Sequence, residues 1–317
     1  MRILLLCSAL VLTVACGRQP APPADPAPAN PTQSDPLRSR QWGLGALDPE
    51  HAAWPATRGE GVTVAVIDSG VDRDQPDLAG RVDDGIDLVD PGTPPDDGYG
   101  HGTHVAGIIA AEPDNGLGMA GLAPLARILP VRVLDDDGEG SFGRTAYGIR
   151  WAVDHGAQVL NLSLTLTQDD PQVRRAVQYA VDHNVVAVAA AGNRPCPESG
   201  ADETVYPAAY PQVIGVGAAN KAGDVSGFSS CGSWVDVLAP GVSIVSIAPK
   251  DARKPECSDG KGWCYLTGTS EAAPFVSAAA ALRIAQLGVA EYDAAEVTRD
   301  VIRAGRDGLD LKALLSP

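Results

Sequence analysis

Three segments of the sequence each place one reactive side chain beside glycine, at the end of a candidate strand or the start of a candidate helix. An apolar run ends in Asp68, Gly-His-Gly-Thr-His carries His101, and Gly-Thr-Ser-Glu-Ala carries Ser270. A hydroxyl that attacks, an imidazole that moves its proton and a carboxylate that orients the imidazole are the groups that nucleophilic acyl transfer requires. We therefore predict that Asp68, His101 and Ser270 are catalytic.

Each candidate also has a plainer structural reading. Asp68 could cap the turn after its strand, and Ser270 could be the N-cap of its helix. His101 and His104 have a spacing found in helical metal ligands, but no third ligand cluster accompanies them in the sequence. We favour catalysis because the three segments together supply a nucleophile, a base and an orienting acid. We interpret His104 as a packed, structural histidine.

Apolar runs typical of buried strands alternate with helix-like stretches from residue 41 onward. The alternation predicts one α/β domain over residues 41–317, with a mainly parallel central sheet and helices on both faces. Such sheets bind ligands beyond the carboxyl ends of their strands, which is where Asp68 stands. The strand candidates are residues 62–67, 128–133, 159–164, 185–190, 213–217, 235–238 and 242–247. The helix candidates are residues 103–111, 144–155, 171–183, 270–286 and 293–303.

The three reactive segments, in the order Asp68, His101, Ser270, resemble those of the subtilisin-like serine proteases, the subtilase or S8 family. The resemblance extends from about residue 41 to the C-terminus. It implies the subtilisin-like three-layer fold and a serine endopeptidase that works through an acyl-enzyme intermediate. It also implies that Asn193 and the backbone N–H of Ser270 stabilise the oxyanion, although Asn193 could simply occupy a left-handed turn. Further motifs in register are residues 161–164, 189–193, 206–208 and 237–241.

The same resemblance implies a groove in which an extended peptide pairs as an added strand. Substrate residues before the scissile bond would each have a pocket, and the first pocket would hold the residue next to the cut. Phe142 would border the pocket for the substrate residue three positions further from the cut. Thr165 stands where the family usually has Gly, so its Cβ narrows the entrance to the first pocket. The expected groove residues are Gly138, Glu139, Gly140, Phe142, Ser163, Leu164, Thr165, Ala189 and Gly192.

Two residues near the candidate nucleophile depart from the family pattern. Glu271 replaces the usual Met or another uncharged residue, and Phe275 replaces the usual His. A carboxylate beside Ser270 could hinder oxyanion formation, or could raise the pKa of His101 by stabilising its charged form. The second effect predicts activity at higher pH.

Calcium is the metal that the resemblance suggests, as a structural ion, and no cofactor is expected for catalysis. Calcium prefers six to eight hard oxygen ligands, which an acidic exported protein can supply. The alternative is a loop closed by ordinary turn hydrogen bonds. The expected ligands are the side chains of Asp35, Asp77 and Asn115 and the carbonyls of Pro113, Leu117 and Met119.

The chain begins with a candidate targeting segment. A positively charged start precedes an apolar run over residues 3–15, shorter than the roughly 20 residues that span a bilayer. We therefore expect residues 1–15 to be a secretory signal peptide.

The end of that run, residues 12–17, resembles a bacterial lipoprotein signal. It implies a lipidated Cys16 and a Pro- and Ala-rich tether over residues 16–40, which would hold the protein on a membrane surface. Thr13 stands where the signal usually has Leu, so cleavage without lipid is the alternative. We expect an exported protein, either a periplasmic or cell-surface lipoprotein or a secreted one.

Export also governs the cysteines of the body, because thiols oxidise outside the cytosol. Cys196, Cys231, Cys257 and Cys264 form an even set that we expect to make two disulfides. Three pairings are open. We favour Cys257 with Cys264, which closes a short loop, and Cys196 with Cys231.

Composition narrows the choice of partners. The 317 residues include 24 Lys and Arg against 40 Asp and Glu, a net charge of −16, and no basic run offsets it. Such a charge repels phosphate backbones, so we expect no nucleic-acid partner. We expect polypeptide substrates and a monomer.

A rival hypothesis is a catalytically silent protein that keeps the groove and captures exported polypeptides. The complete catalytic set argues against it, because a decayed enzyme has no reason to keep every triad position and Asn193. An esterase of the α/β-hydrolase type is not supported, because Ser270 lies outside a Gly-x-Ser-x-Gly turn and the triad order differs.

Overall fold

The computed structural model describes residues 34–48, 51–195 and 204–316. Each strand and helix that the sequence predicts overlaps an observed one, and α1, β2, β9 and α7 are additional. The strands are β1 (Thr63–Asp68), β2 (Ile86–Asp87), β3 (Arg127–Arg132), β4 (Val159–Leu162), β5 (Val186–Ala190), β6 (Val213–Ala219), β7 (Val237–Pro240), β8 (Ile244–Ile247) and β9 (Trp263–Leu266). The helices are α1 (Trp42–Leu47), α2 (His101–Ala110), α3 (Phe142–Asp154), α4 (Pro171–Asp182), α5 (Thr269–Leu287), α6 (Ala294–Gly305) and α7 (Leu311–Leu315).

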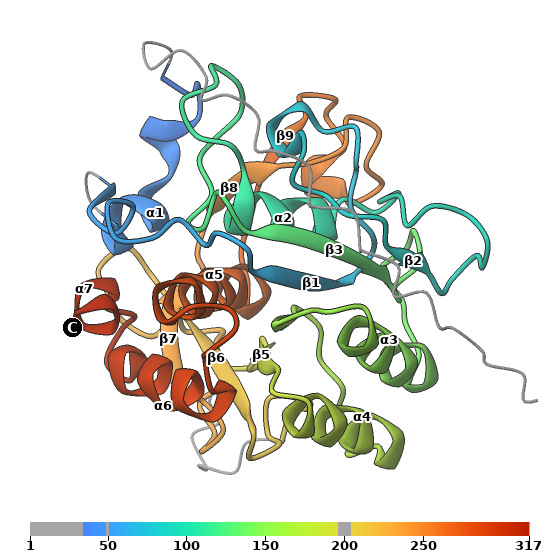
Figure 1. Cartoon of the computed structure of the whole chain (residues 1–317). Coiled ribbons are helices and arrows are strands. Elements are labelled where there is room, and N and C mark those ends of the chain that lie inside the picture. The colour runs from blue at the N-terminus through green and yellow to red at the C-terminus, as the bar shows by residue number, and fades with distance from the viewer. Residues whose placement is uncertain (1–33, 49–50, 196–203, 317) are drawn as a thin grey trace, which may run out of the picture.

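The central sheet of the described residues has seven strands in the order β2-β3-β1-β4-β5-β6-β7, and every neighbouring pair is parallel (Figure 1). Side chains of β1 alternate between two cores, with Val64 and Val66 in one and Ala65 and Ile67 in the other. Both faces of the strand are therefore buried, which explains its nearly continuous apolar sequence. The mainly parallel sheet predicted from the sequence is confirmed.

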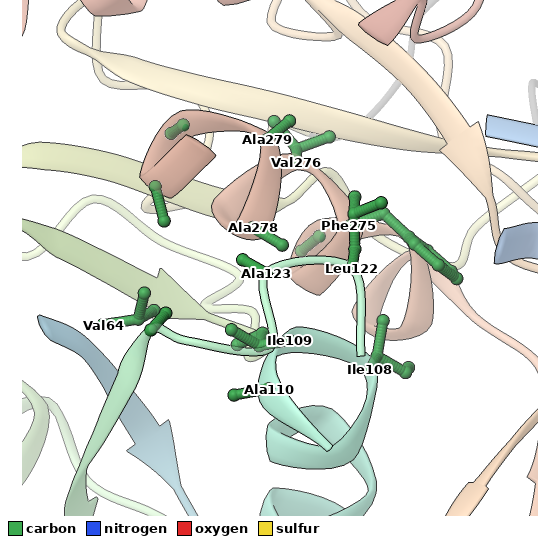
Figure 2. Close-up of a cluster of buried hydrophobic side chains, with 14 of the residues drawn as sticks. Val64, Ile108, Ile109, Ala110, Leu122, Ala123, Phe275, Val276, Ala278 and Ala279 are labelled. Carbon is green, nitrogen blue, oxygen red and sulfur yellow. The ribbon is translucent and has the colours of Figure 1, made fainter. Parts of the chain in front are cut away.

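Helices cover both faces of this sheet. On one face, α2, α5 and α6 contribute to the larger core, which includes Val64, Ile109 and Val276 (Figure 2). Phe275, one of the two departures noted above, is buried in the same core. On the other face, α3 and α4 form a second core with β1 and its neighbours. The result is the expected three-layer α/β arrangement.

The order of the strands creates a switch point beside β1. The chain leaves β1, passes through α2 to β3 on one side, and returns through α3 to β4 on the other side. The register pairs Val66 with Asn161, so Asp68 and Ser163 leave the sheet at the same edge. Ligands of open α/β sheets bind at such a point, beyond the carboxyl ends of the strands.

A two-stranded antiparallel sheet, β8 with β9, stands apart from the main sheet. The segment before β9 is closed by a disulfide between Cys257 and Cys264, which confirms that predicted pair. Cys196 lies outside the described residues, so its pairing with Cys231 stays a prediction.

The predicted signal peptide and Cys16 also lie outside the described residues, as does the predicted tether up to residue 33. The last part of that tether lies against the domain, because Leu37 is buried and its N–H donates to the carbonyl of Gly118 at 2.9 Å. Among the helices of the described residues, none combines the length and the apolar character needed to cross a bilayer.

Candidate active site

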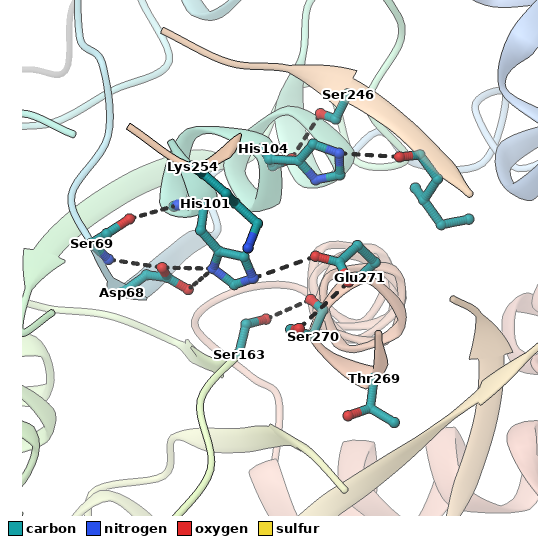
Figure 3. A network of polar contacts seen from close by, with 12 residues as sticks. Asp68, Ser69, His101, His104, Ser163, Ser246, Lys254, Thr269, Ser270 and Glu271 are labelled. Carbon is teal, nitrogen blue, oxygen red and sulfur yellow. Dashed lines mark hydrogen bonds and ion pairs between the residues drawn. The ribbon is translucent and has the colours of Figure 1, made fainter. Parts of the chain in front are cut away.

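Asp68 is the last residue of β1 and is fully buried. Its Oδ1 accepts hydrogen bonds from the N–H of Ser69 (2.8 Å) and from Nδ1 of His101 (2.8 Å), and its Oδ2 lies 3.0 Å from the same nitrogen (Figure 3). A carboxylate in this position keeps the proton on Nδ1 and leaves Nε2 of His101 for proton exchange.

Glycine allows His101 to approach Asp68 so closely. His101 is the first residue of α2, and Gly102 follows it in the first turn. A Cβ on Gly102 would collide with the carbonyl oxygen of Gly70, just beyond the end of β1. Only glycine therefore lets the start of α2 pack against the end of this strand.

Asp97, which the sequence analysis did not single out, holds the start of α2. Its Oδ1 accepts from the N–H of Gly100 (2.7 Å) and the hydroxyl of Ser69 (2.8 Å). Its Oδ2 accepts from the N–H (2.8 Å) and the hydroxyl (2.7 Å) of Thr103. Burial raises the pKa of this carboxyl, against the opposing effect of these hydrogen bonds. Because Asp97 joins the segment after β1 to the helix, it fixes the position of His101 relative to the strand.

Ser270 lies in the first turn of α5, and its carbonyl has an unusual partner. Pro274, four residues later, has no N–H, so the helix cannot make its usual hydrogen bond to that carbonyl. The hydroxyl of Ser163 donates to it instead, at 2.8 Å. Asn161 in turn donates to Ser163 Oγ (2.9 Å) and accepts from the hydroxyl of Ser277 (2.8 Å). This chain of hydrogen bonds ties the first turn of α5 to the end of β4.

Asn193 reaches the same region from the segment after β5. Its Oδ1 accepts from the N–H (2.7 Å) and the hydroxyl (3.0 Å) of Thr269, so its amide nitrogen points the other way. A Cβ on Gly268 would lie 2.7 Å from Glu271 Oε2 and 3.0 Å from both Asn193 Nδ2 and Ser270 Oγ. Because residue 268 is glycine, the amide donor and the hydroxyl face one small space.

Glu271 is buried and lies between the hydroxyl and the imidazole. Its Oε1 is 3.4 Å from Nε2 of His101, and its Oε2 accepts from Oγ of Ser270 at 3.5 Å (Figure 3). The described residues contain no direct hydrogen bond between Ser270 and His101. The carboxylate of Glu271 therefore bridges the two groups that would exchange a proton.

The two carboxylates control the protonation of His101. Burial by itself would lower the pKa of this imidazole, but the charges and hydrogen bonds of Asp68 and Glu271 outweigh burial and hold the pKa well above its usual value. Burial would likewise raise the pKa of Glu271, but the hydrogen bond and charge of His101 lower it on balance. The two carboxylates therefore favour the imidazolium form of His101.

His104 is fully buried three residues after His101. Its Nε2 donates to the carbonyl of Ile244 at 3.1 Å, and its backbone carbonyl accepts from the hydroxyl of Ser246 at 2.7 Å. Burial lowers its pKa to about 4, so it is neutral. His104 joins α2 to β8, which agrees with its interpretation as a packed, structural histidine.

An open groove with a volume of about 720 Å³ runs past His101 and Asn193. Three of the expected groove residues, Glu139, Ala189 and Gly192, are not among those that line it. Ala189 is fully buried in β5, and Glu139 forms a turn with Asp135. The expected residues that do line the groove are Gly138, Gly140, Phe142, Ser163, Leu164 and Thr165.

The groove is also lined by residues that the sequence analysis missed, among them Tyr99 and Lys254. The ammonium of Lys254 lies 3.3 Å from the hydroxyl of Tyr99 and 4.9 Å from the centre of its ring. Tyr99 stands two residues before His101, and this closeness to a candidate catalytic residue is a sequence signal that could have pointed to it. Lys254 is distant in the sequence and carries no local signal.

The three expected side-chain calcium ligands lie together near the end of α2. The carboxylate of Asp35 accepts from the N–H groups of Asp114 (2.9 Å) and Asn115 (3.2 Å). The carboxylate of Asp77 accepts from Asn115 Nδ2 (2.9 Å) and from the N–H of Met119 (2.7 Å). Burial raises the pKa of Asp77 to about 6. Within the described ranges, no group of three or more His, Cys, Asp or Glu side chains is arranged to hold a metal ion.

Comparison with known proteins identifies the family. The Subtilase family matches residues 59–306, which contain all three candidate catalytic residues. The chain belongs to the subtilase family. It is therefore a serine endopeptidase by class, and subtilases need no cofactor for catalysis.

Two curated relatives and one solved structure illustrate the match. The subtilase is 46% identical to the thermophilic serine proteinase of Bacillus sp. (strain AK1) over 235 residues, 74% of this chain and 55% of that protein. It is 42% identical to thermitase of Thermoactinomyces vulgaris over 256 residues, 80% of this chain and 86% of that protein. Its fold matches fervidolysin from Fervidobacterium pennivorans with a TM-score of 0.78 and 33% identity, covering 90% of this chain and 47% of that one.

Proposed function

We propose that this subtilase hydrolyses peptide bonds in exported or extracellular polypeptides through Asp68, His101 and Ser270, with an acyl-enzyme intermediate. One observation carries the proposal. The imidazole of His101 is held by Asp68 through Nδ1, and its Nε2 is turned toward the start of α5, beside an open groove. Proton transfer between a hydroxyl and a leaving amine requires a base oriented in this way.

The first step is attack of Ser270 Oγ on the scissile carbonyl. Nε2 of neutral His101 takes the hydroxyl proton, and Asp68 stabilises the imidazolium that forms. The carbonyl carbon becomes tetrahedral, and its oxygen carries the negative charge. Nε2 then gives the proton to the leaving amine, which leaves the acyl group on Ser270. Water repeats the sequence and releases the second product.

Two donors support stabilisation of the oxyanion. The backbone N–H of Ser270 is in the first turn of α5, where N–H groups lack partners within the helix and the helix dipole favours negative charge. Asn193 Nδ2 shares the space beside Gly268 with Ser270 Oγ. Thr269 holds the amide in this orientation, so the donor is positioned before the substrate arrives.

The groove supports a polypeptide substrate. It is bordered on one side by Gly138 and Gly140 and on the other by Ser163, Leu164 and Thr165. An extended peptide lying between two such segments can bond to their backbones as an added strand. Thr165 places a Cβ in the groove, so we expect a narrow pocket for the residue before the cut.

A fluorophosphonate probe, which reacts with activated serine, tests this function. We expect the wild type to be labelled and Ser270→Ala to remain unlabelled, with tandem mass spectrometry placing the adduct on Ser270. Peptide-library cleavage by the same protein then gives the pocket preference. Folded wild type that stays unlabelled from about pH 6 to about pH 10 would instead support a silent peptide-binding protein.

We further propose that Asp35, Asp77 and Asn115 hold a structural calcium ion, with the carbonyls of Pro113, Leu117 and Met119. The two carboxylates are hard donors that suit calcium. Asn115 would add its amide oxygen by turning it from the N–H of Leu117 toward the ion. The raised pKa of Asp77 supports the fit, because a buried carboxylate without a cation is costly to ionise. The ion would tie the segment at Asp35 to the loop after α2.

Export and lipidation of Cys16 complete the proposal. The apolar run over residues 3–15 and the Cys that follows it support a processed lipoprotein signal. Intact mass spectrometry of the mature protein distinguishes the two outcomes. A diacylglyceryl mass on Cys16 supports the anchor, and a free N-terminus near this residue supports secretion.

A further inference from the structure

Glu271 is a buried carboxylate on the side of His101 that faces the nucleophile. Its side chain is 2% exposed, and it projects from α5 toward α2. One carboxylate oxygen is 3.4 Å from Nε2 of His101, and the other accepts from Ser270 Oγ. The hydrogen bond and charge of His101 lower the pKa of Glu271 and so favour its carboxylate. Nε2 can bond to that carboxylate only as an N–H donor, because two acceptors do not attract each other.

Charged and titratable groups from several described elements pack around His101. Asp68 at the end of β1 faces Nδ1, and Asp97 lies behind the start of α2 with its oxygens committed to four donors. His104 on α2 is buried and neutral. Lys254 comes from the loop before β9 and is packed on Tyr99, while its charge favours the ionised form of Glu271. Two carboxylates face the imidazole, one at each nitrogen.

We propose that Glu271 is a positioning residue that holds His101 in its protonated form at neutral pH, so that Ser270 becomes reactive only in alkaline solution. The inference rests on the proposed function and adds a pH gate to the same site. Glu271 touches no substrate in this scheme and acts through His101 and Ser270.

The gate works by loss of one proton. At neutral pH, Nε2–H of His101 donates to Glu271, and the imidazolium cannot accept a proton from Ser270. When hydroxide removes that proton, forming water, the attraction between Nε2 and Glu271 ends. The lone pair on Nε2 can then accept the proton of Ser270 Oγ, whose hydroxyl can turn from the carboxylate to the imidazole.

Removing the charge of Glu271 should therefore open the gate at lower pH. An opposite charge within about 4 Å shifts a pKa by roughly 1 to 3 units, which sets the size of the effect. We expect Glu271→Gln to move the acid limb of the pH profile down by about 1 to 3 pH units. Glu271→Met, which is neutral and cannot accept the hydroxyl proton as a carboxylate does, should shift the limb in the same direction.

The measurement is the second-order rate of fluorophosphonate labelling from about pH 5 to about pH 11. Glu291→Gln makes the same chemical change at an exposed position beyond the far end of α5, and its profile should match the wild type. An unshifted limb in both Glu271 variants would overturn the inference. So would a large loss of labelling at all pH values in both folded variants, because that result would make Glu271 a proton acceptor in the reaction.

A second measurement does not depend on activity. Nitrogen chemical shifts of His101 can be titrated in Ser270→Ala and in the double variant Ser270→Ala with Glu271→Gln. We expect the His101 titration to lie about 1 to 3 pH units lower in the double variant. Equal titrations contradict the gate even if no variant is labelled, whereas shifted titrations without labelling contradict only the proposed protease activity.

Discussion

The hydroxyl of Ser163 donates a hydrogen bond to the carbonyl oxygen of Ser270, 2.8 Å away. Ser163 follows β4, and Ser270 lies in the first turn of α5, so this bond joins one side of the groove to the residue proposed to attack the substrate. Pro274 leaves this carbonyl available, because any other residue at position 274 would donate its backbone N–H to it in the regular helical hydrogen bond.

Ser163→Ala should destabilise the protein and disturb the nucleophile. The change removes one buried hydrogen bond and leaves Asn161 Nδ2 without its acceptor, so we expect the free energy of unfolding to fall by about 1 to 3 kcal/mol. Urea denaturation measures this loss. Ser277→Ala removes the other end of the same chain, farther from Ser270, and should lower stability while leaving the labelling rate of Ser270 closer to wild type. Equal labelling rates in both variants would contradict the positioning role of Ser163.

Asn193→Ala should reduce turnover rather than substrate affinity. The amide is proposed to stabilise charge that exists only in the transition state, so we expect kcat to fall by roughly 10²- to 10³-fold with KM little changed. Thr269→Val is the comparison, since it removes the hydroxyl that orients the amide but keeps the backbone N–H bonded to Asn193 Oδ1. It should lose much less activity. A rise in KM at constant kcat would mean that Asn193 contributes only to ground-state binding.

Calcium should stabilise the protein increasingly as pH rises. In the folded protein the pKa of Asp77 is about 6 instead of 3.8, so the folded state binds the proton more tightly than the unfolded state does. Without a cation, this group lowers the free energy of unfolding by about 3 kcal/mol as pH rises from about 4 to 7. A bound cation would oppose that loss by favouring the carboxylate.

Thermal unfolding with and without calcium checks this prediction at about pH 5 and about pH 8. We expect calcium to raise Tm at both values and more at the higher one. Asp77→Asn cannot supply a carboxylate and should show a much smaller response. If calcium changes Tm at neither pH, the result would support the alternative, in which ordinary turn hydrogen bonds close the loop and no metal binds.

Removal of the disulfide between Cys257 and Cys264 should destabilise the protein measurably. The two residues are 7 positions apart, and closing a loop of that size restricts the unfolded chain by about 2 to 3 kcal/mol. The variant Cys257→Ala with Cys264→Ala should lose about that much free energy of unfolding in a denaturant titration under non-reducing conditions. Ser258→Ala, in the same loop, keeps the bridge and serves as the control. A double variant as stable as the control would show that the loop is held by packing alone.

The three candidate catalytic residues can be found in the sequence because each stands in a local pattern. Asp68 ends an apolar strand, and His101 and Ser270 each begin a helix beside glycine. Such patterns also give the order of strands and helices, since buried parallel strands and covering helices differ in length and in residue type. Ends of elements are less well determined, as β7 shows. It begins at Val237, two residues later than expected, because its pairing with β6 decides where it starts.

Other features depend on how distant elements pack and have no local signal. Asp96 and Asp97 are adjacent acidic residues, yet Asp97 is buried against the start of α2, where it holds four donors. Glu271 stands next to Ser270 in the sequence, but its contact with His101 depends on the packing of α5 against α2. Lys254 enters the groove only because the loop before β9 folds back over Tyr99.

The covalent link before β9 bears on how the protein should be made. It closes a segment that begins three residues after Lys254, a residue that lines the groove. Thiols stay reduced in the cytosol of most expression hosts, so protein made there would lack this disulfide. Recombinant material for kinetics should therefore be directed to the periplasm or the culture medium, or be oxidised during refolding, before any two preparations are compared.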